Sequence, residues 1–242
     1  MSERRTPPSL RPSTPLEKPP SGKAEIDAFI LGARSLAVPA DGRGRLILAL
    51  DATMSRQPTW DLACTLQAEM FDAVGKSAGL SVQLAYFRGL TESRTSRFVE
   101  NTEALKSLMQ KISCQGGMTQ ISRILSHALK ETKARKVQAV IFIGDAMEEN
   151  VDELATLAGS LGLSGTPVFI FQEGRDCAAE TAFKEIARLS RGAWFRFDHS
   201  SAAVLARLLS SISVYASGVV AALQSRGGEA DRLLLEQLGG SR

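Results

Sequence analysis

Cysteine and histidine are scarce in this sequence, and their scarcity excludes several kinds of site. The chain has three cysteines, an odd and scattered set, and two histidines. This pattern predicts free thiols in a reducing compartment instead of a disulfide framework. No cysteine and histidine pair has the spacing of a zinc site, and neither histidine accompanies a serine or cysteine nucleophile in a recognisable motif. Zinc binding and hydrolysis by such a nucleophile are therefore not indicated.

Long apolar runs are also missing. No uninterrupted apolar segment approaches the roughly 20 residues that a membrane helix needs. The N-terminal sequence MSERRTPPSL is charged and proline-rich with no apolar stretch behind it, so a secretory signal is not expected. These absences predict a cytoplasmic protein without a membrane segment.

The net charge of +3 does not indicate nucleic-acid binding. Five positive charges lie near the N-terminus, and they leave the rest of the chain close to neutral. The residues concerned are Arg4, Arg5, Arg11, Lys18 and Lys23.

The length of 242 residues and the 44% hydrophobic content predict one domain with tails. Residues 1–23 are rich in proline and basic residues and are predicted to be disordered. Residues 24–223 form the predicted domain, with a helix at 24–37 preceding a core at 43–223. Residues 224–242 are a C-terminal tail whose leucines favour a short helix. That helix either docks on another protein, which we prefer, or folds back on the domain.

Between the tails, apolar periodicity alternates between strand and helix spacing. This alternation predicts an α/β fold, a doubly wound, mostly parallel, Rossmann-like sheet with one short antiparallel edge strand and helices on both faces. The strands are predicted at 46–50, 81–87, 94–99, 137–143, 167–172 and 193–197. The helices are predicted at 60–74, 101–112, 121–132, 149–160, 176–190 and 201–223.

Oxygen-bearing side chains follow the first buried strand. The apolar run LILAL ends at Asp51, and Thr53 and Ser55 follow at alternate positions. Residues at this spacing in an extended segment project to the same side. The carboxyl edge of a parallel sheet is where such folds bind ligands, so we expect the carboxylate and the hydroxyls to converge there.

Two further segments are predicted to reach the same edge. Thr119 lies in the glycine-rich GGMTQI, immediately before a helix, and Asp145 ends the buried strand VIFIGD. Two carboxylates and three hydroxyls are hard oxygen ligands, which suit Mg²⁺ or Mn²⁺.

These three motifs, DATMS, GGMT and IGD in that order, resemble the metal-ion-dependent adhesion site of von Willebrand factor A (VWA) domains. The resemblance covers roughly residues 43–223 and is closest to cytosolic bacterial members. It implies that Thr53, Ser55 and Thr119 bind the metal directly, and that Asp51 and Asp145 complete or orient the shell. It also implies a non-enzymatic role, in which the metal captures an acidic residue of a partner protein. Similar domains work beside AAA+ ATPases or in assembly complexes, so such an ATPase is the expected partner class.

The sequence departs from the usual pattern at two places. Thr53 stands where serine is common, which keeps the hydroxyl but restricts its rotamer. Ala146 stands where glycine is frequent, and Glu148 and Glu149 follow it. We interpret these two acids as the negative first turn of a helix. The alternative is that they support the metal site.

An enzymatic alternative is a metal-dependent phosphohydrolase on a similar sheet. Haloacid-dehalogenase-type enzymes also begin with a buried strand and an aspartate. Their general acid is a second aspartate two residues later, where this chain has Thr53. A hydroxyl cannot replace that acid at neutral pH, so we prefer the interaction module.

Overall fold

A computed structural model gives the structure of the protein and describes residues 44–57, 60, 80–100, 102–197, 211, 228, 232 and 234. The predicted N-terminal tail and the helices predicted at 24–37 and 201–223 lie outside the described residues, apart from residue 211. The same holds for the helix predicted at 60–74, apart from residue 60, and for most of the C-terminal tail.

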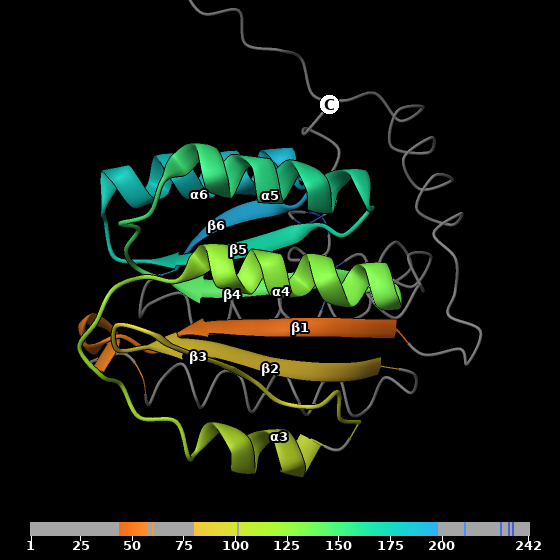
Figure 1. Ribbon diagram of the computed structural model, residues 1–242, viewed down its shortest axis with the longest axis horizontal. Coiled ribbons are helices and arrows are strands. Elements are labelled where there is room, and N and C mark those ends of the chain that lie inside the picture. Colours follow the sequence, from red (N-terminus) through yellow and green to blue (C-terminus); the bar gives the residue numbers. More distant parts are fainter. Residues whose placement is uncertain are drawn as a thin grey trace, which may run out of the picture.

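Six strands form one sheet in the order β3-β2-β1-β4-β5-β6 (Figure 1). All neighbouring strands are parallel except β2 and β3, which are antiparallel. The predicted α/β class, with one antiparallel edge strand, is therefore confirmed. The strands are β1 (Gly44–Asp51), β2 (Leu80–Arg88), β3 (Glu92–Thr95), β4 (Ala139–Gly144), β5 (Val168–Glu173) and β6 (Ala193–Phe197).

Strand β1 lies at the centre of the sheet and is buried along its whole length. It pairs with β2 on one side and β4 on the other, so that Leu48 is aligned with Leu84 and Ile141. Both Ile47 and Leu48 are fully buried although they point to opposite faces. Both faces of the sheet are therefore covered, as the continuous apolar run predicts.

Three helices pack side by side on one face of the sheet (Figure 1). They are α4 (Ile121–Ala134), α5 (Val151–Leu163) and α6 (Cys177–Leu189), while α3 (Thr102–Met109) lies apart from them. Each places apolar residues three and four positions apart toward the strands. In α4 these residues are Ile121, Ile124, Leu125 and Ala128.

Two predicted boundaries are wrong in ways that affect the site. Strand β3 begins at Glu92 instead of 94, because a tight turn with Gly89 at φ +60° follows β2 immediately. Helix α5 begins at Val151 instead of 149, because Asn150 caps it by accepting hydrogen bonds from the N–H groups of Asp152 and Glu153.

Among the described residues, no helix combines the length and the apolar character needed to cross a membrane. In the C-terminal segment, the Arg232 N–H donates to the Gly228 carbonyl, and Leu234 is fully buried within the chain. The Leu234 side chain is therefore already covered by the protein itself.

Candidate metal centre

The candidate centre lies where the winding of the sheet reverses, between β1 and β4. The sheet extends in opposite directions from these two neighbouring strands, whose arrowheads point to the same end (Figure 1). Open α/β sheets bind ligands outside the carboxyl ends of strands at such a reversal. Asp51 is the last residue of β1, and Asp145 directly follows β4. Leu50 is aligned with Ile143, so the two carboxylates leave the sheet on adjacent strands.

Asp51 is fully buried, yet hydrogen bonds satisfy only one of its oxygens. Oδ1 accepts the Thr53 N–H at 2.8 Å, whereas Oδ2 is buried with no hydrogen-bond partner among the described residues. Burial raises the pKa of Asp51 to about 6, and the neighbouring Asp145 carboxylate also raises it, against the opposing effects of Thr53 and Arg56. A bound cation would relieve both the burial and the repulsion.

Asp145 offers a second oxygen of the same kind. The residue is partly exposed, but its Oδ1 is buried and has no hydrogen-bond partner in the part of the chain that the structure describes. A Cβ added at the preceding Gly144 would lie only 3.5 Å from the Asp51 Cβ. The two strand ends therefore bring two incompletely bonded carboxylates close together.

Two hydroxyls lie directly beyond Asp51. Thr53 is extended, at φ −74° and ψ 164°, and a short 3₁₀ helix, η1 (Met54–Arg56), follows it. The Thr53 Oγ1 and the Ser55 Oγ are 3.0 Å apart. The DATMS segment thus brings its two hydroxyls into contact, with Thr53 buried and Ser55 exposed.

Thr119 reaches this edge through a loop that is held on both sides. On one side, the Gln115 N–H donates to the Ala52 carbonyl at 3.0 Å, which continues the backbone pairing beyond β1. On the other side, the Met118 N–H donates to the Gly89 carbonyl at 3.2 Å, in the turn between β2 and β3. The loop is therefore clamped between the end of β1 and the β2–β3 turn.

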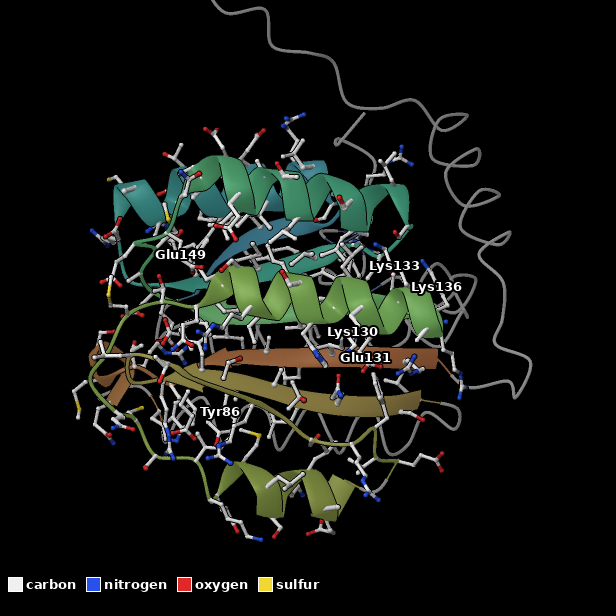
Figure 2. All side chains as sticks on the ribbon, viewed as in Figure 1. Tyr86, Lys130, Glu131, Lys133, Lys136 and Glu149 are labelled. Atoms are coloured by element: carbon white, nitrogen blue, oxygen red, sulfur yellow. The ribbon has the colours of Figure 1, made fainter. Side chains whose placement is uncertain are left out.

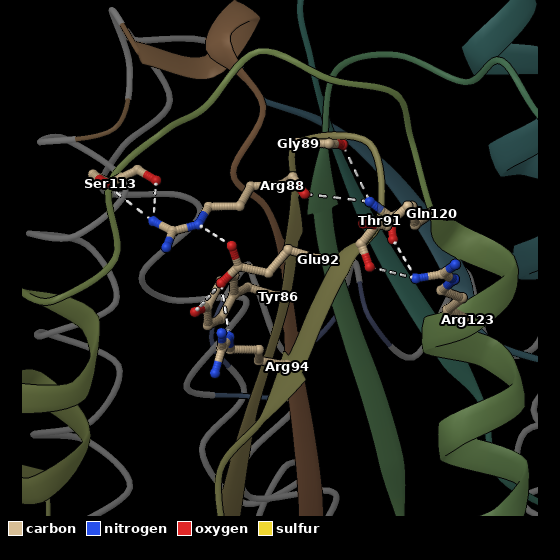
Figure 3. A network of polar contacts seen from close by, with 9 residues as sticks. All are labelled: Tyr86, Arg88, Gly89, Thr91, Glu92, Arg94, Ser113, Gln120 and Arg123. Carbon is tan, nitrogen blue, oxygen red and sulfur yellow. Dashed lines mark hydrogen bonds and ion pairs between the residues drawn. The ribbon is translucent and has the colours of Figure 1, made fainter.

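Side chains reinforce this clamp (Figure 3). Gln120 is buried, and its Nε2 donates to the carbonyls of Arg88 and Gly89 at 3.3 and 3.2 Å. Its Oε1 accepts from Arg123, which also donates to the Thr91 carbonyl. At the other end of the loop, Arg88 donates to the Ser113 carbonyl and hydroxyl. This role of the β2–β3 turn was not predicted from the sequence, because it depends on contacts between distant segments.

Glu148 is joined directly to Thr119. Its carboxylate accepts the Thr119 N–H at 3.0 Å, and its own N–H donates to the Thr119 Oγ1 at 3.1 Å. One acceptor site of that hydroxyl is used in this way, which leaves the second for a cation. Glu148 therefore fixes the loop that carries Thr119 to the loop that carries Asp145.

Glu149 caps the start of α4 and does not belong to the helix that follows it in the sequence. Its two carboxylate oxygens accept the N–H groups of Ile121 and Ser122 at the start of α4. Figure 2 shows Glu149 near the start of α4 and Lys136 near the opposite end of that helix. The prediction that Glu148 and Glu149 form the first turn of a helix is wrong, because both precede α5 and their carboxylates bond to the Thr119 segment instead.

A buried ion pair joins the residue that follows the DATMS segment to the end of β5. Arg56 is fully buried, and its Nε lies 2.9 Å from the Glu173 Oε2 at the end of β5. The pair ties η1 to the sheet two strands away from β1. Neither residue was predicted from the sequence to support the site, although two signals were present: an arginine directly after the motif and a glutamate at the end of the apolar strand VFIFQE.

The donor set fits a hard divalent cation. No cluster of three or more His, Cys, Asp or Glu side chains suited to a metal ion occurs in the described ranges. A cation at this edge would therefore depend on the two aspartates together with hydroxyl and water oxygens, the ligand set that Mg²⁺ and Mn²⁺ accept. The buried unpaired oxygens of Asp51 and Asp145 are consistent with that requirement.

Comparison with known proteins identifies the fold but not the family. No family model matches the sequence, and no curated protein matches it. Among solved structures, a von Willebrand factor type A protein from Catenulispora acidiphila has a TM-score of 0.59 at 16% identity. The match covers 72% of this chain and 43% of that one, so this chain corresponds to less than half of that protein.

Two other structures show the same architecture. The SpRpn10 VWA domain has a TM-score of 0.57 at 11% identity, with 68% of this chain and 94% of that chain covered. Proximal thread matrix protein 1 from the mussel byssus, with a zinc-occupied MIDAS motif, has a TM-score of 0.58 at 15% identity, covering 73% and 47%. The described structure therefore has the VWA fold.

Proposed function

We propose that this chain is a protein-interaction module that uses a bound Mg²⁺ or Mn²⁺ to recognise a carboxylate on a partner protein. The proposal rests chiefly on one observation. Asp51 Oδ2 and Asp145 Oδ1 are buried without hydrogen-bond partners among the described residues, at the reversal point of the sheet. Buried carboxylate oxygens of this kind are costly unless a cation is bound.

Thr53, Ser55 and Thr119 would hold the cation directly, and Asp51 and Asp145 would complete or orient its shell. The cation would supply a concentrated positive charge with an open position, which attracts an anionic group. The chain's own contribution is to fix the oxygen atoms beforehand. Asp51 binds the Thr53 backbone, Glu148 binds Thr119, and the Arg56–Glu173 pair holds the end of η1.

The mussel protein with a zinc-occupied MIDAS motif supports this proposal by showing that the fold accommodates a metal at such a motif. It does not decide which metal this chain prefers. An AAA+ ATPase is our proposed partner class, on the sequence resemblance alone, and co-purification with such an ATPase in Mg²⁺ but not in EDTA would test it.

The metal assignment is tested by thermal unfolding of the full chain with Mg²⁺ or Mn²⁺ and with EDTA. A ligand that binds only the folded state raises the melting temperature in proportion to RT ln(1 + [L]/Kd). We expect Thr119→Ala to remove most of the metal-induced rise while the metal-free protein remains folded.

Thr181→Ala is the matched control, since its hydroxyl bonds to the Cys177 carbonyl on α6, a helix that carries none of the candidate ligands. It should retain the full rise. An equal metal response in wild-type protein and Thr119→Ala would contradict the assignment of Thr119 as a ligand.

The same preparations distinguish binding from catalysis. A metal-dependent phosphohydrolase would turn over p-nitrophenyl phosphate in Mg²⁺ and lose that activity in Asp51→Ala. We expect no Asp51-dependent turnover, and its detection would favour the enzymatic alternative.

A further inference from the structure

Large apolar side chains are exposed around the candidate metal centre. Among the described residues, five large hydrophobic side chains are exposed. One of them, Leu163, is the last residue of α5, at the end of that helix away from the centre. The other four follow the segments that build the centre. They are Met54 at 53%, Leu90 at 72%, Met118 at 53% and Val151 at 45% exposure.

Three of these side chains are linked to the candidate ligands by short backbone connections. Met54 lies between Thr53 and Ser55, and Met118 directly precedes Thr119. Leu90 follows Gly89, whose carbonyl accepts the Met118 N–H at 3.2 Å. We call Met54, Leu90 and Met118 the apolar collar.

Exposing apolar side chains on loops has no stabilising effect on the fold, and clusters of them mark interaction sites. Methionine suits such a surface, because its flexible thioether adapts to differently shaped partners. The collar residues follow the same segments as the candidate ligands Thr53, Ser55 and Thr119, and the unpaired oxygens of Asp51 and Asp145 call for a cation at that edge. The charge complementary to a cation is a carboxylate, and the surface complementary to the collar is apolar.

We infer that the apolar collar selects, on a partner protein, a carboxylate flanked by bulky apolar side chains, and that Met54 and Met118 determine this specificity. The inference rests on the proposed metal-dependent function, since the cation supplies the contact to the carboxylate. Apolar neighbours of that carboxylate would exclude water from the contact, and an anion and cation attract each other more strongly once water is excluded.

The probe is a displayed library of random linear peptides, selected on the full chain in Mg²⁺ and eluted with EDTA. We expect the eluted peptides to contain Asp or Glu beside Leu, Ile, Met, Phe or Trp. The double variant Met54→Ser/Met118→Ser should bind such a peptide at least about tenfold more weakly. Its Mg²⁺-induced rise in melting temperature should equal that of the wild type, because neither side chain is a proposed ligand.

Two controls separate the collar from general effects of substitution. The double variant Met54→Leu/Met118→Leu keeps the apolar surface and should restore binding. Leu163→Ser removes an exposed leucine from the far end of α5 and should bind the peptide like the wild type.

The failures of the two proposals are distinguishable. If wild-type protein shows no Mg²⁺-induced rise in melting temperature, the metal centre is wrong and the collar inference falls with it. If that rise is present, the metal centre stands, and any of three results overturns the collar inference. These are an absence of EDTA-eluted peptides, acidic peptides without apolar neighbours, and equal peptide binding by the serine double variant.

Discussion

At the scale of single residues, Asp51 shows how a binding group can oppose the stability of the fold that holds it. Its carboxylate is fully buried, with one oxygen bonded to the Thr53 N–H and one without a hydrogen-bond partner in the described structure. Burial, together with Asp145, raises its pKa from 3.8 to about 6. Ionised Asp51 therefore destabilises the metal-free fold at neutral pH.

The sign of the pH effect follows from this pKa. Because the folded pKa of Asp51 is the higher one, its contribution to stability is fully present below pH 3.8 and is lost as the pH rises through about 6. The shift limits this contribution to roughly 3 kcal/mol. We expect the free energy of unfolding in EDTA to fall more steeply from pH 4.5 to 7.5 in wild-type protein than in Asp51→Asn.

Urea unfolding at a series of pH values measures this difference. Comparing the two proteins at each pH cancels the titration of groups they share, such as Glu92 and Glu180, whose pKa values are lowered by hydrogen bonds. If the free energy of unfolding falls equally with pH in the wild type and in Asp51→Asn, the prediction of a raised pKa for Asp51 in the metal-free fold is wrong.

Glu149 illustrates a residue whose role depends on a distant helix. Its carboxylate accepts two N–H groups at the start of α4, where the positive end of the helix dipole favours negative charge. Glu149→Ala should lower the free energy of unfolding by about 1–2 kcal/mol. Glu103→Ala is the control, because its carboxylate is exposed and forms a surface ion pair with Lys106 at 3.4 Å, so the loss should be less than about 0.5 kcal/mol. Equal losses in the two variants would argue against the cap.

At the scale of elements, the centre depends on loops that distant strands hold in place. Gly117 lies so close to the β2–β3 turn that an added Cβ would be 1.9 Å from the Gly89 carbonyl oxygen. A side chain there must displace the loop that carries Thr119. At the neighbouring Gly116, an added Cβ would meet no atom within 4 Å.

These two glycines form a matched pair for testing the clamp. We expect Gly117→Ala to weaken Mg²⁺ binding by at least about tenfold, which corresponds to 1.4 kcal/mol. Gly116→Ala should leave the affinity within about threefold of wild type. Isothermal titration with Mg²⁺ measures both, and equal affinities for the two variants would show that the position of the loop does not limit metal binding.

At the scale of the whole molecule, the winding of the sheet gathers the candidate residues from three separate segments. β1 and β4 lie side by side although more than ninety positions separate Asp51 from Gly144 at the end of β4. The loop of Thr119 reaches the ends of both strands through Gln115 and Glu148. The collar lies along the same edge. The binding function that we propose therefore belongs to one edge of the sheet.

This localisation makes a prediction about the N-terminal tail. Residues 1–21 contain none of the candidate ligands, so deleting them should leave the Mg²⁺-induced rise in melting temperature unchanged. Differential scanning calorimetry of the truncated chain in Mg²⁺ and in EDTA tests this. A rise reduced by more than half would show that the tail contributes to the metal-bound state.

The sequence by itself predicted the elements whose signals are local. The apolar run before Asp51 identified a strand buried on both faces, and the pattern in 121–132 identified α4, because both depend on neighbours along the chain. The order of strands and helices then predicted the doubly wound sheet. It also placed the ends of β1 and β4, and with them Asp51 and Asp145, at one edge.

Only the tertiary structure decided how that edge is held together. Glu149 looks like a first-turn acid of the next helix, yet it caps α4. Arg56, which follows β1, pairs with Glu173 at the end of β5, with one strand between them. The turn at Gly89, nearly thirty residues away, leaves no room for a side chain at Gly117. Sequence periodicity reports which residues are buried in their own element. It carries no information on which distant carboxylate, carbonyl or turn meets them, because that depends on the register and packing of the whole sheet.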